Sequence, residues 1–185
     1  EATTSWELKK NLIDAAKLLL NENDRIQIQR IALLSPWEKK KQQEFLQYKY
    51  NSLVVELTTT GETALKFFKE HGLEAAHFNR KTLYNRFLKL SKGVFDGFDA
   101  GQLYQNMQEG KPLYPKKVDG EVQQIIDRLS GQIIGYFEKA LYLFFQWQLI
   151  KDIKKQWIPL SLVTSLSREL EAYQNETNKV LLSTF

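Results

Sequence analysis

Apolar residues recur at alternating spacings of three and four along most of the chain, which is the period of an α-helix. The two longest runs cover residues 36–71 and 120–157. Each run is long enough to span about 50 Å at 1.5 Å per residue. The recurring positions are Leu46, Tyr50, Leu53, Leu57, Thr60, Ala64 and Phe67 in the first run, and Val122, Ile126, Leu129, Ile133, Phe137, Ala140, Phe144 and Trp147 in the second.

Residues that favour helix ends stand at the boundaries of both runs. Ser35-Pro36-Trp37-Glu38 combines a capping serine, a proline at the first helical position and a glutamate that completes a capping box. Asp119 is placed to cap the second run, Gly72 to end the first, and Pro159 to end the second. Residues 58–61, Thr-Thr-Thr-Gly, favour helix poorly and predict a kink or a break there.

Weaker patterns predict shorter helices around these two. A first helix is expected to begin at Thr4, and residues 25–34 are assigned to a helix although two isoleucines alternate as in a strand. Further helices are predicted at about 80–96, from Asp99 through Met107, and after Pro159 at about 163–180.

These elements predict an all-α fold. We expect the two long helices to pack antiparallel, with the first and last helices alongside, in a four-helix-like bundle that carries short extra helices. A chain of 185 residues is long enough to bury a core of its own. We therefore predict one domain over residues 1–185, with a single long loop at about 109–120.

Residues 136–157 are the most apolar and aromatic part of the chain. The 11 uncharged residues between Lys139 and Lys151 are fewer than the about 20 that a membrane-spanning helix needs. A helix that is apolar nearly all round is typical of a buried core helix. An oligomer interface, or a groove for a lipid or small apolar ligand lined by Phe144, Phe145 and Trp147, remains the alternative.

Composition excludes several kinds of chemistry. Without cysteine there is no disulfide and no thiol nucleophile. The single Glu-x-x-His unit, residues 74–77, lacks the second unit that a di-iron bundle needs, and no glycine-rich phosphate loop is present. We therefore predict no catalytic residue, no metal site and no cofactor. The net charge of +4 agrees with an acidic partner but does not require one.

One segment concentrates positive charge. Arg80, Lys81, Arg86, Lys89 and Lys92 fall within thirteen residues that contain no acid. This pattern is typical of a cationic surface that contacts nucleic acid or anionic lipid, and equally of the solvated side of an amphipathic helix.

The stretch NRKTLYNRF, residues 79–87, resembles the recognition helix of factor-for-inversion-type and TetR-type helix-turn-helix regulators. In those families the threonine, tyrosine and basic residues of such a helix touch the backbone and bases of DNA. The resemblance covers about ten residues of 185. It also departs from the motif, because His77 and Phe78 stand where the tight turn has a small residue.

The long loop offers a second candidate surface. Tyr104 precedes it, and Tyr114, Lys116 and Lys117 lie within it. Long loops with exposed aromatic residues often contact partners. We therefore favour a non-enzymatic interaction protein, exported or associated with the cell envelope, that binds a protein partner. Nucleic-acid binding by residues 80–92 is the first alternative and apolar-ligand binding the second.

Overall fold

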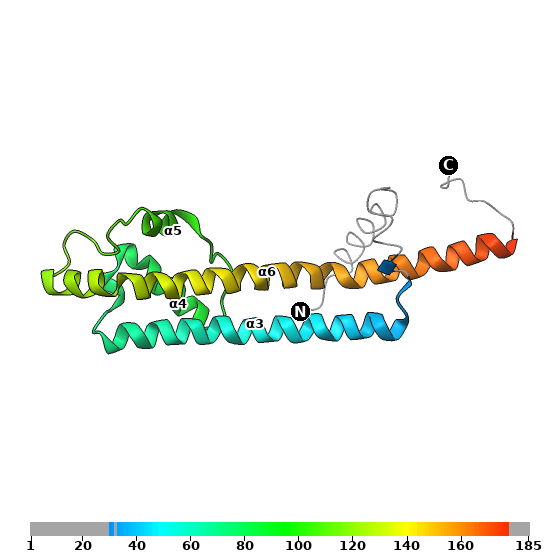
Figure 1. Cartoon of the computed structure of the whole chain (residues 1–185), viewed down its shortest axis with the longest axis horizontal. Coiled ribbons are helices and arrows are strands. Elements are labelled where there is room, and N and C mark those ends of the chain that lie inside the picture. Colours follow the sequence, from blue (N-terminus) through cyan, green and yellow to red (C-terminus); the bar gives the residue numbers. More distant parts are fainter. Residues whose placement is uncertain (1–29, 32, 178–185) are drawn as a thin grey trace. The chain divides into compact units, whose positions relative to one another are not determined.

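The computed structural model describes residues 30–31 and 33–177 (Figure 1). Its helices are α3 (Pro36–Glu70), α4 (Thr82–Ser91), α5 (Gly101–Gln108) and α6 (Gly120–Thr177). Two short 3-10 helices, η1 (Ala75–His77) and η2 (Asn79–Lys81), lie between α3 and α4. The described residues contain no strand, so the predicted all-α fold is confirmed. The helix predicted from Thr4 lies outside these residues.

The internal contacts divide the chain into two compact units. One comprises Glu1–Tyr48 with Ile150–Phe185, and the other comprises Lys49–Leu149. The helices α3 and α6 each contribute residues to both units, so the boundaries of the units fall within these two helices. The prediction of one domain stays a prediction, whereas the predicted loop is present between α5 and α6.

The first turn of α3 forms the predicted capping box. The Glu38 backbone N–H donates to Ser35 Oγ at 3.2 Å, and the Ser35 backbone N–H donates to Glu38 Oε2 at 2.7 Å. Hydrogen bonds from Ser35 lower the pKa of the Glu38 carboxyl. Each partner satisfies an amide that the helix itself leaves unpaired.

The predicted break at residues 58–61 is wrong, because α3 continues through them without interruption. The Thr60 hydroxyl donates to the Glu56 carbonyl and the Thr63 hydroxyl to the Thr59 carbonyl, both at 2.7 Å. Gly61 is buried where α4 crosses α3. Tertiary packing at the glycine therefore overrides the weak helix propensity of the segment.

The helix α6 begins as predicted and ends twenty residues later than predicted. The Asp119 carboxylate accepts a hydrogen bond of 2.9 Å from the Glu121 backbone N–H. Pro159 lies inside the helix, which continues to Thr177, so the two predicted C-terminal helices are one. The proline costs one backbone hydrogen bond, which a helix tolerates with a local bend.

Among the described residues, no helix is both long and apolar enough to cross a membrane.

Three helices build the core of the unit Lys49–Leu149. Ring contacts join α3 to α6 at Tyr50–Trp147 (6.2 Å) and Phe67–Tyr136 (5.4 Å between centroids), an antiparallel arrangement that Figure 1 shows. The α4 side chain Phe87 contacts both long helices, through Phe68 and Phe137. The fully buried large side chains of this core are Phe68, Phe78, Phe87, Phe137, Leu57, Leu83, Leu90, Ile126 and Ile133.

In the other unit, Lys39 of α3 lies against α6. Its ammonium donates to Ser165 Oγ at 3.0 Å and to Thr164 Oγ1 at 3.3 Å. Burial lowers the pKa of this ammonium, and the charge of Arg168 lowers it further. No sequence pattern pointed to this polar contact, because its partners lie more than 120 residues away along the chain.

Candidate functional site

The basic segment begins with an unusual turn. Arg80 and Lys81 both adopt left-handed backbone conformations, with φ of 51° and 58°. Residues other than glycine seldom do so, and such strain is found most often where the chain performs a function. The turn starts α4 at Thr82, and Gly93, with φ of 70°, follows the end of the helix. The helix is therefore shorter than the predicted 80–96.

Four cations of this segment are exposed. Lys81 and Lys92 flank α4 at its two ends, Lys89 lies in its last turn, and Arg80 comes directly before Lys81. None of the four cations has an ion pair or hydrogen-bond partner among the residues that the structure describes. The first turn of α4 also contains no acid and receives no side-chain cap. The positive end of the helix therefore adds to the charge of this surface.

Arg86 has a different environment from the other four. Its Nη2 lies 2.9 Å from Asp99 Oδ1, and its Nη1 donates to the Asp99 carbonyl. The guanidinium lies 5.8 Å from the ring of Phe98 and 5.7 Å from that of Phe137, and the side chain is only 18% exposed. Arg86 therefore ties α4 to the 95–100 segment. Within the predicted basic patch, Arg86 differs from the other four residues in having a partner. The helix predicted to begin at Asp99 has Ala100 as its N-cap.

We expect Arg86→Met to lower the free energy of unfolding by roughly 1–2 kcal/mol, because the charged hydrogen bonds to Asp99 are lost. The matched change Lys89→Met removes the same charge from a side chain without a partner and is expected to stay within about 0.5 kcal/mol of the parent. Urea denaturation of both variants checks this. Equal stabilities would show that the Arg86 contacts contribute nothing.

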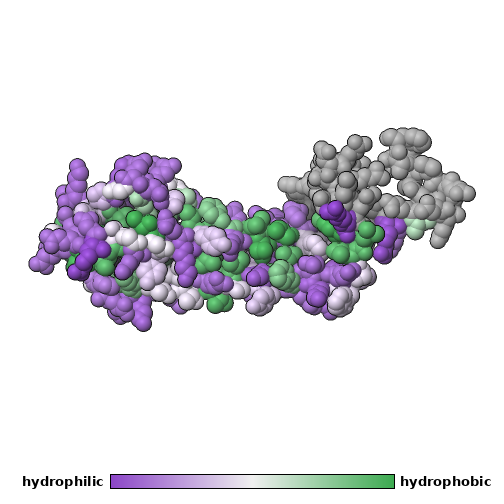
Figure 2. Space-filling model, in the orientation of Figure 1, coloured by the Kyte–Doolittle hydropathy of each residue, from purple (hydrophilic) through white to green (hydrophobic). Residues whose placement is uncertain are grey.

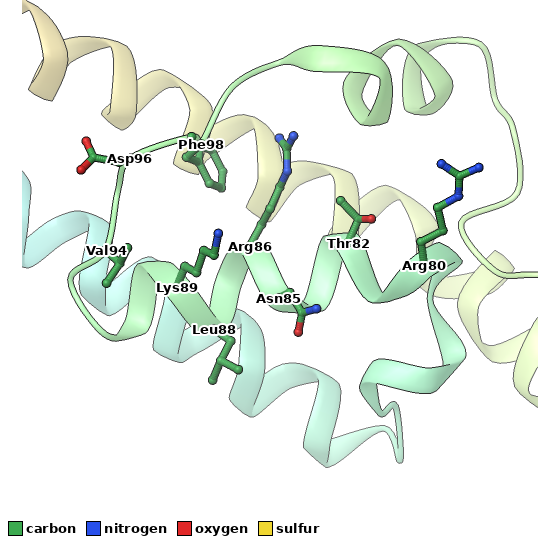
Figure 3. A pocket seen from close by; sticks show the side chains of 10 residues that line it. Arg80, Thr82, Asn85, Arg86, Leu88, Lys89, Val94, Asp96 and Phe98 are labelled. Carbon is green, nitrogen blue, oxygen red and sulfur yellow. The ribbon is translucent and has the colours of Figure 1, made fainter.

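A pocket of about 410 Å³ opens between α4 and the segment 94–98. In Figure 3, Thr82, Arg86 and Lys89 leave α4 on the side of Phe98, and Arg80 projects in the same direction from before the helix. Asn85 and Leu88 lie at the other edge of α4. The lining residues are Arg80, Thr82, Asn85, Arg86, Leu88, Lys89, Val94, Asp96, Gly97 and Phe98.

The tyrosines of the second candidate surface are engaged with α6. Tyr104 donates to Glu138 at 3.2 Å, and Tyr114 donates to Asp127 at 3.0 Å. Desolvation and the Glu138 carboxylate raise the pKa of Tyr104, and the hydrogen bond to Asp127 raises the pKa of Tyr114. These hydroxyls hold α5 and the loop in place.

The loop between α5 and α6 is also fixed to the basic turn. The Leu113 carbonyl accepts from the Asn79 backbone N–H at 2.9 Å, and the Pro112 carbonyl accepts from the Asn79 side chain at 2.8 Å. Lys116 and Lys117 remain exposed. A partner that reaches this loop would meet the two lysines and not the tyrosine hydroxyls.

The three residues of the candidate apolar groove lie on different sides of α6. Phe144 and Trp147 are buried, with centroid distances of 5.8 Å from Phe144 to Phe98 and 5.2 Å from Trp147 to Phe95. Phe145 is 53% exposed. Neither pocket described in this structure is lined by any of the three. Apolar-ligand binding stays a prediction.

The predicted burial of α6 nearly all round is wrong. Tyr142, Phe145 and Leu149 share one side of the helix and are 64%, 53% and 60% exposed. Figure 2 shows apolar side chains at the surface over this middle part of α6. Periodicity alone did not find this, because these residues are as apolar as their buried neighbours.

His71 and His77 each contact a backbone atom close to them in the sequence. His77 Nδ1 accepts a hydrogen bond of 3.1 Å from the Glu74 backbone N–H, and His71 Nδ1 lies 2.8 Å from the Phe67 carbonyl oxygen. In the described ranges, no three carboxylate or histidine side chains gather as a metal site would require.

The chain matches no protein-family model, no curated protein and no solved structure. The fold also differs from the helix-turn-helix motif that residues 79–87 resemble. That motif joins its helices by a turn of about three or four residues. Here α3 ends at Glu70 and α4 begins at Thr82, with two 3-10 helices between them. The local likeness therefore extends to α4 and not to the helix before it.

Proposed function

We propose that this protein acts by binding, and that its partner is a nucleic acid held through its phosphates on the outer side of α4. One observation carries the proposal. Arg80, Lys81, Lys89 and Lys92 are exposed and have no partner among the described residues, while Arg86 at the centre of the same segment is paired with Asp99. Arg86 therefore serves the packing of α4, whereas the other four cations make no contact that this packing requires.

The arrangement of these cations suits a polyanion. Over its ten residues α4 extends about 15 Å, and the cations stand at both of its ends. Lysine and arginine side chains that neutralise phosphates release counterions from a nucleic acid, and this release supplies most of the affinity for any sequence. Hydrogen-bonding side chains between the cations, Thr82 and Asn85, are of the kind that contact sugar, phosphate and base edges.

A protein partner, which the sequence favoured, stays a prediction, as do the absence of enzymatic activity and the export of the protein. An acidic protein surface would use the same four cations. A nucleic acid is preferred because its phosphates repeat at a density that one acidic helix does not match.

The triple variant Lys81→Gln, Lys89→Gln and Lys92→Gln is expected to bind a fluorescent oligonucleotide at least about tenfold more weakly at roughly 100 mM salt. Glutamine removes the charge and keeps a polar side chain that is one atom shorter. Arg86 is left intact, because its loss is expected to weaken the fold. Fluorescence anisotropy measures the affinity, with a single strand and a duplex of equal length.

The control removes three exposed charges elsewhere in the same unit, through Lys69→Gln, Arg128→Gln and Lys139→Gln. Because the net charge falls equally, a general loss of electrostatic attraction would weaken both triple variants alike. Binding that survives in the α4 variant, or that falls equally in the control, would overturn the proposed site.

A further inference from the structure

The exposed side of α6 carries a row of apolar side chains. Tyr142, Phe145 and Leu149 follow one another at spacings of three and four, and each is more than half exposed. These spacings place the three along one line of the helix. The line lies on the side of α6 opposite to Ile133 and Ala140, which are buried in the core. The packing of this unit therefore does not use the apolar row, and such a row is typical of a surface that another molecule covers.

The same line continues toward the start of α6 through Gly135 and Gly131. Both glycines are exposed, and a Cβ at either position would meet nothing within 4 Å. Small residues on a helix let the backbone of a second helix approach closely. The exposed side of α6 therefore has protruding apolar side chains in one half and open backbone in the other.

Charged side chains flank this line with one sign on each side. Asp127 and Glu138 lie on one flank, and Arg128 and Lys139 lie on the other, because neighbouring residues of a helix are about 100° apart. All four are exposed. Each carboxylate accepts a tyrosine hydrogen bond through one oxygen atom, which leaves its second oxygen to accept from another molecule.

We propose that a second copy of this chain covers this side of α6, and that the two α6 helices pack parallel along residues 127–149. In a parallel pair related by a twofold axis, the acidic flank of each helix faces the basic flank of the other. Asp127 then meets the partner's Arg128, Glu138 meets the partner's Lys139, and each contact occurs twice. An antiparallel pair would place acid opposite acid and base opposite base, so the charges select the parallel arrangement.

The area of this surface suits a reversible dimer. Because a fully exposed aromatic side chain presents about 150–250 Å², the apolar row exposes roughly 300 Å² in each copy. Pairing would bury about twice that from the row alone, and the glycine backbone and the charged flanks add to it. Interfaces below about 1,200 Å² in total are weak, so we expect a dissociation constant of roughly 10–100 µM. Pairing of this kind does not require a nucleic acid.

Sedimentation equilibrium of the parent protein between about 5 and 300 µM is expected to show monomers and dimers in equilibrium. The double variant Tyr142→Gln and Leu149→Gln removes apolar surface from the row and is expected to weaken dimerisation at least about tenfold. Both side chains are exposed, so the fold is expected to stay intact, which urea denaturation checks. The control Val55→Gln and Val94→Gln removes two exposed apolar side chains elsewhere in the same unit and is expected to dimerise like the parent.

Two further variants test the orientation of the helices. Lys139→Glu places acids opposite each other in a parallel pair and is expected to weaken dimerisation about three- to tenfold. In an antiparallel pair the same change would replace one like-charged contact with another. Because the chain has no cysteine, Gly131→Cys supplies a single thiol. A parallel pair places this thiol beside its own copy, so oxidation is expected to give a disulfide-linked dimer, whereas Gln148→Cys, exposed on another side of α6, is expected to give none.

A parent protein that stays monomeric at the highest concentration would overturn the proposal. Equal dimerisation of the Tyr142 and Leu149 variant and of its control would overturn the proposed surface. A dimer that is insensitive to Lys139→Glu, or that forms no disulfide through Gly131→Cys, would overturn the parallel arrangement. Binding of a monomeric parent to neutral lipid vesicles, lost in the Tyr142 and Leu149 variant, would assign the apolar row to a membrane surface instead.

Discussion

Replacing Phe137 by alanine is expected to lower the free energy of unfolding by about 3–5 kcal/mol, the largest effect of any single change considered. Phe137 is completely buried, and its ring contacts three other aromatic rings. The centroid distances are 6.4 Å to Phe87 of α4, 5.3 Å to Phe98 and 6.0 Å to Tyr104 of α5. Removing the ring leaves a cavity where all of these meet, and takes away one of the rings below Arg86.

The control for this change lies on the same helix. Phe145→Ala deletes the same atoms from a side chain that is 53% exposed, and is expected to change the free energy of unfolding by about 0.5 kcal/mol or less. Urea denaturation at one protein concentration compares the two. Similar losses in both variants would contradict the division of α6 into a buried and an exposed side.

Gly61→Ala is expected to destabilise the protein by about 2–3 kcal/mol, although alanine is the better helix former. A Cβ at this position would stand 2.6 Å from the Ser91 backbone nitrogen, 2.8 Å from Leu90 Cβ and 2.9 Å from the Phe87 carbonyl oxygen. Two of these atoms belong to the backbone of α4, so the whole helix must move to admit the methyl group.

At two other glycines, we expect a change to alanine to have the opposite effect on stability. Gly131 and Gly135 lie inside α6, and a Cβ at either would meet nothing within 4 Å. Each change to alanine is expected to stabilise the protein by about 0.5–1 kcal/mol through helix propensity alone. Thermal unfolding of the three variants checks the contrast in sign. A stabilising Gly61→Ala would show that α4 does not approach α3 as closely as described.

Elements with local causes were predictable from the sequence. The capping box at Ser35 and the cap at Asp119 each form between residues at most three positions apart, so the local sequence determines their hydrogen bonds. The antiparallel pair of long helices follows from apolar periodicity, which reports one buried side per helix.

Features that depend on contacts between residues far apart in the sequence were not predictable in this way. The uninterrupted helix across Gly61 depends on α4, and nothing near Gly61 in sequence shows that α4 will cross there. The continuation of α6 through Pro159 likewise depends on more than the proline itself, since sequence rules place helix ends at such a residue.

The candidate site shows the same limit. The cluster from Arg80 to Lys92 was visible as a run of charge, but its division into one structural and four exposed cations was not. That division depends on Asp99, which follows Arg86 by 13 residues and reaches it only because the 92–100 segment folds back over α4. The acids at 96 and 99 were the available signal in the sequence.

The most direct test of binding through α4 is the salt dependence of the affinity of the parent protein for an oligonucleotide. Four phosphate contacts predict a slope of log K against log salt of about −2.8 for a single strand and −3.6 for a duplex. The affinity would then fall roughly 50- to 150-fold between about 50 and 200 mM salt. In the Lys81, Lys89 and Lys92 triple variant the slope should shrink to about −1. A slope near zero in the parent protein, or the same slope in both proteins, would contradict binding through these cations.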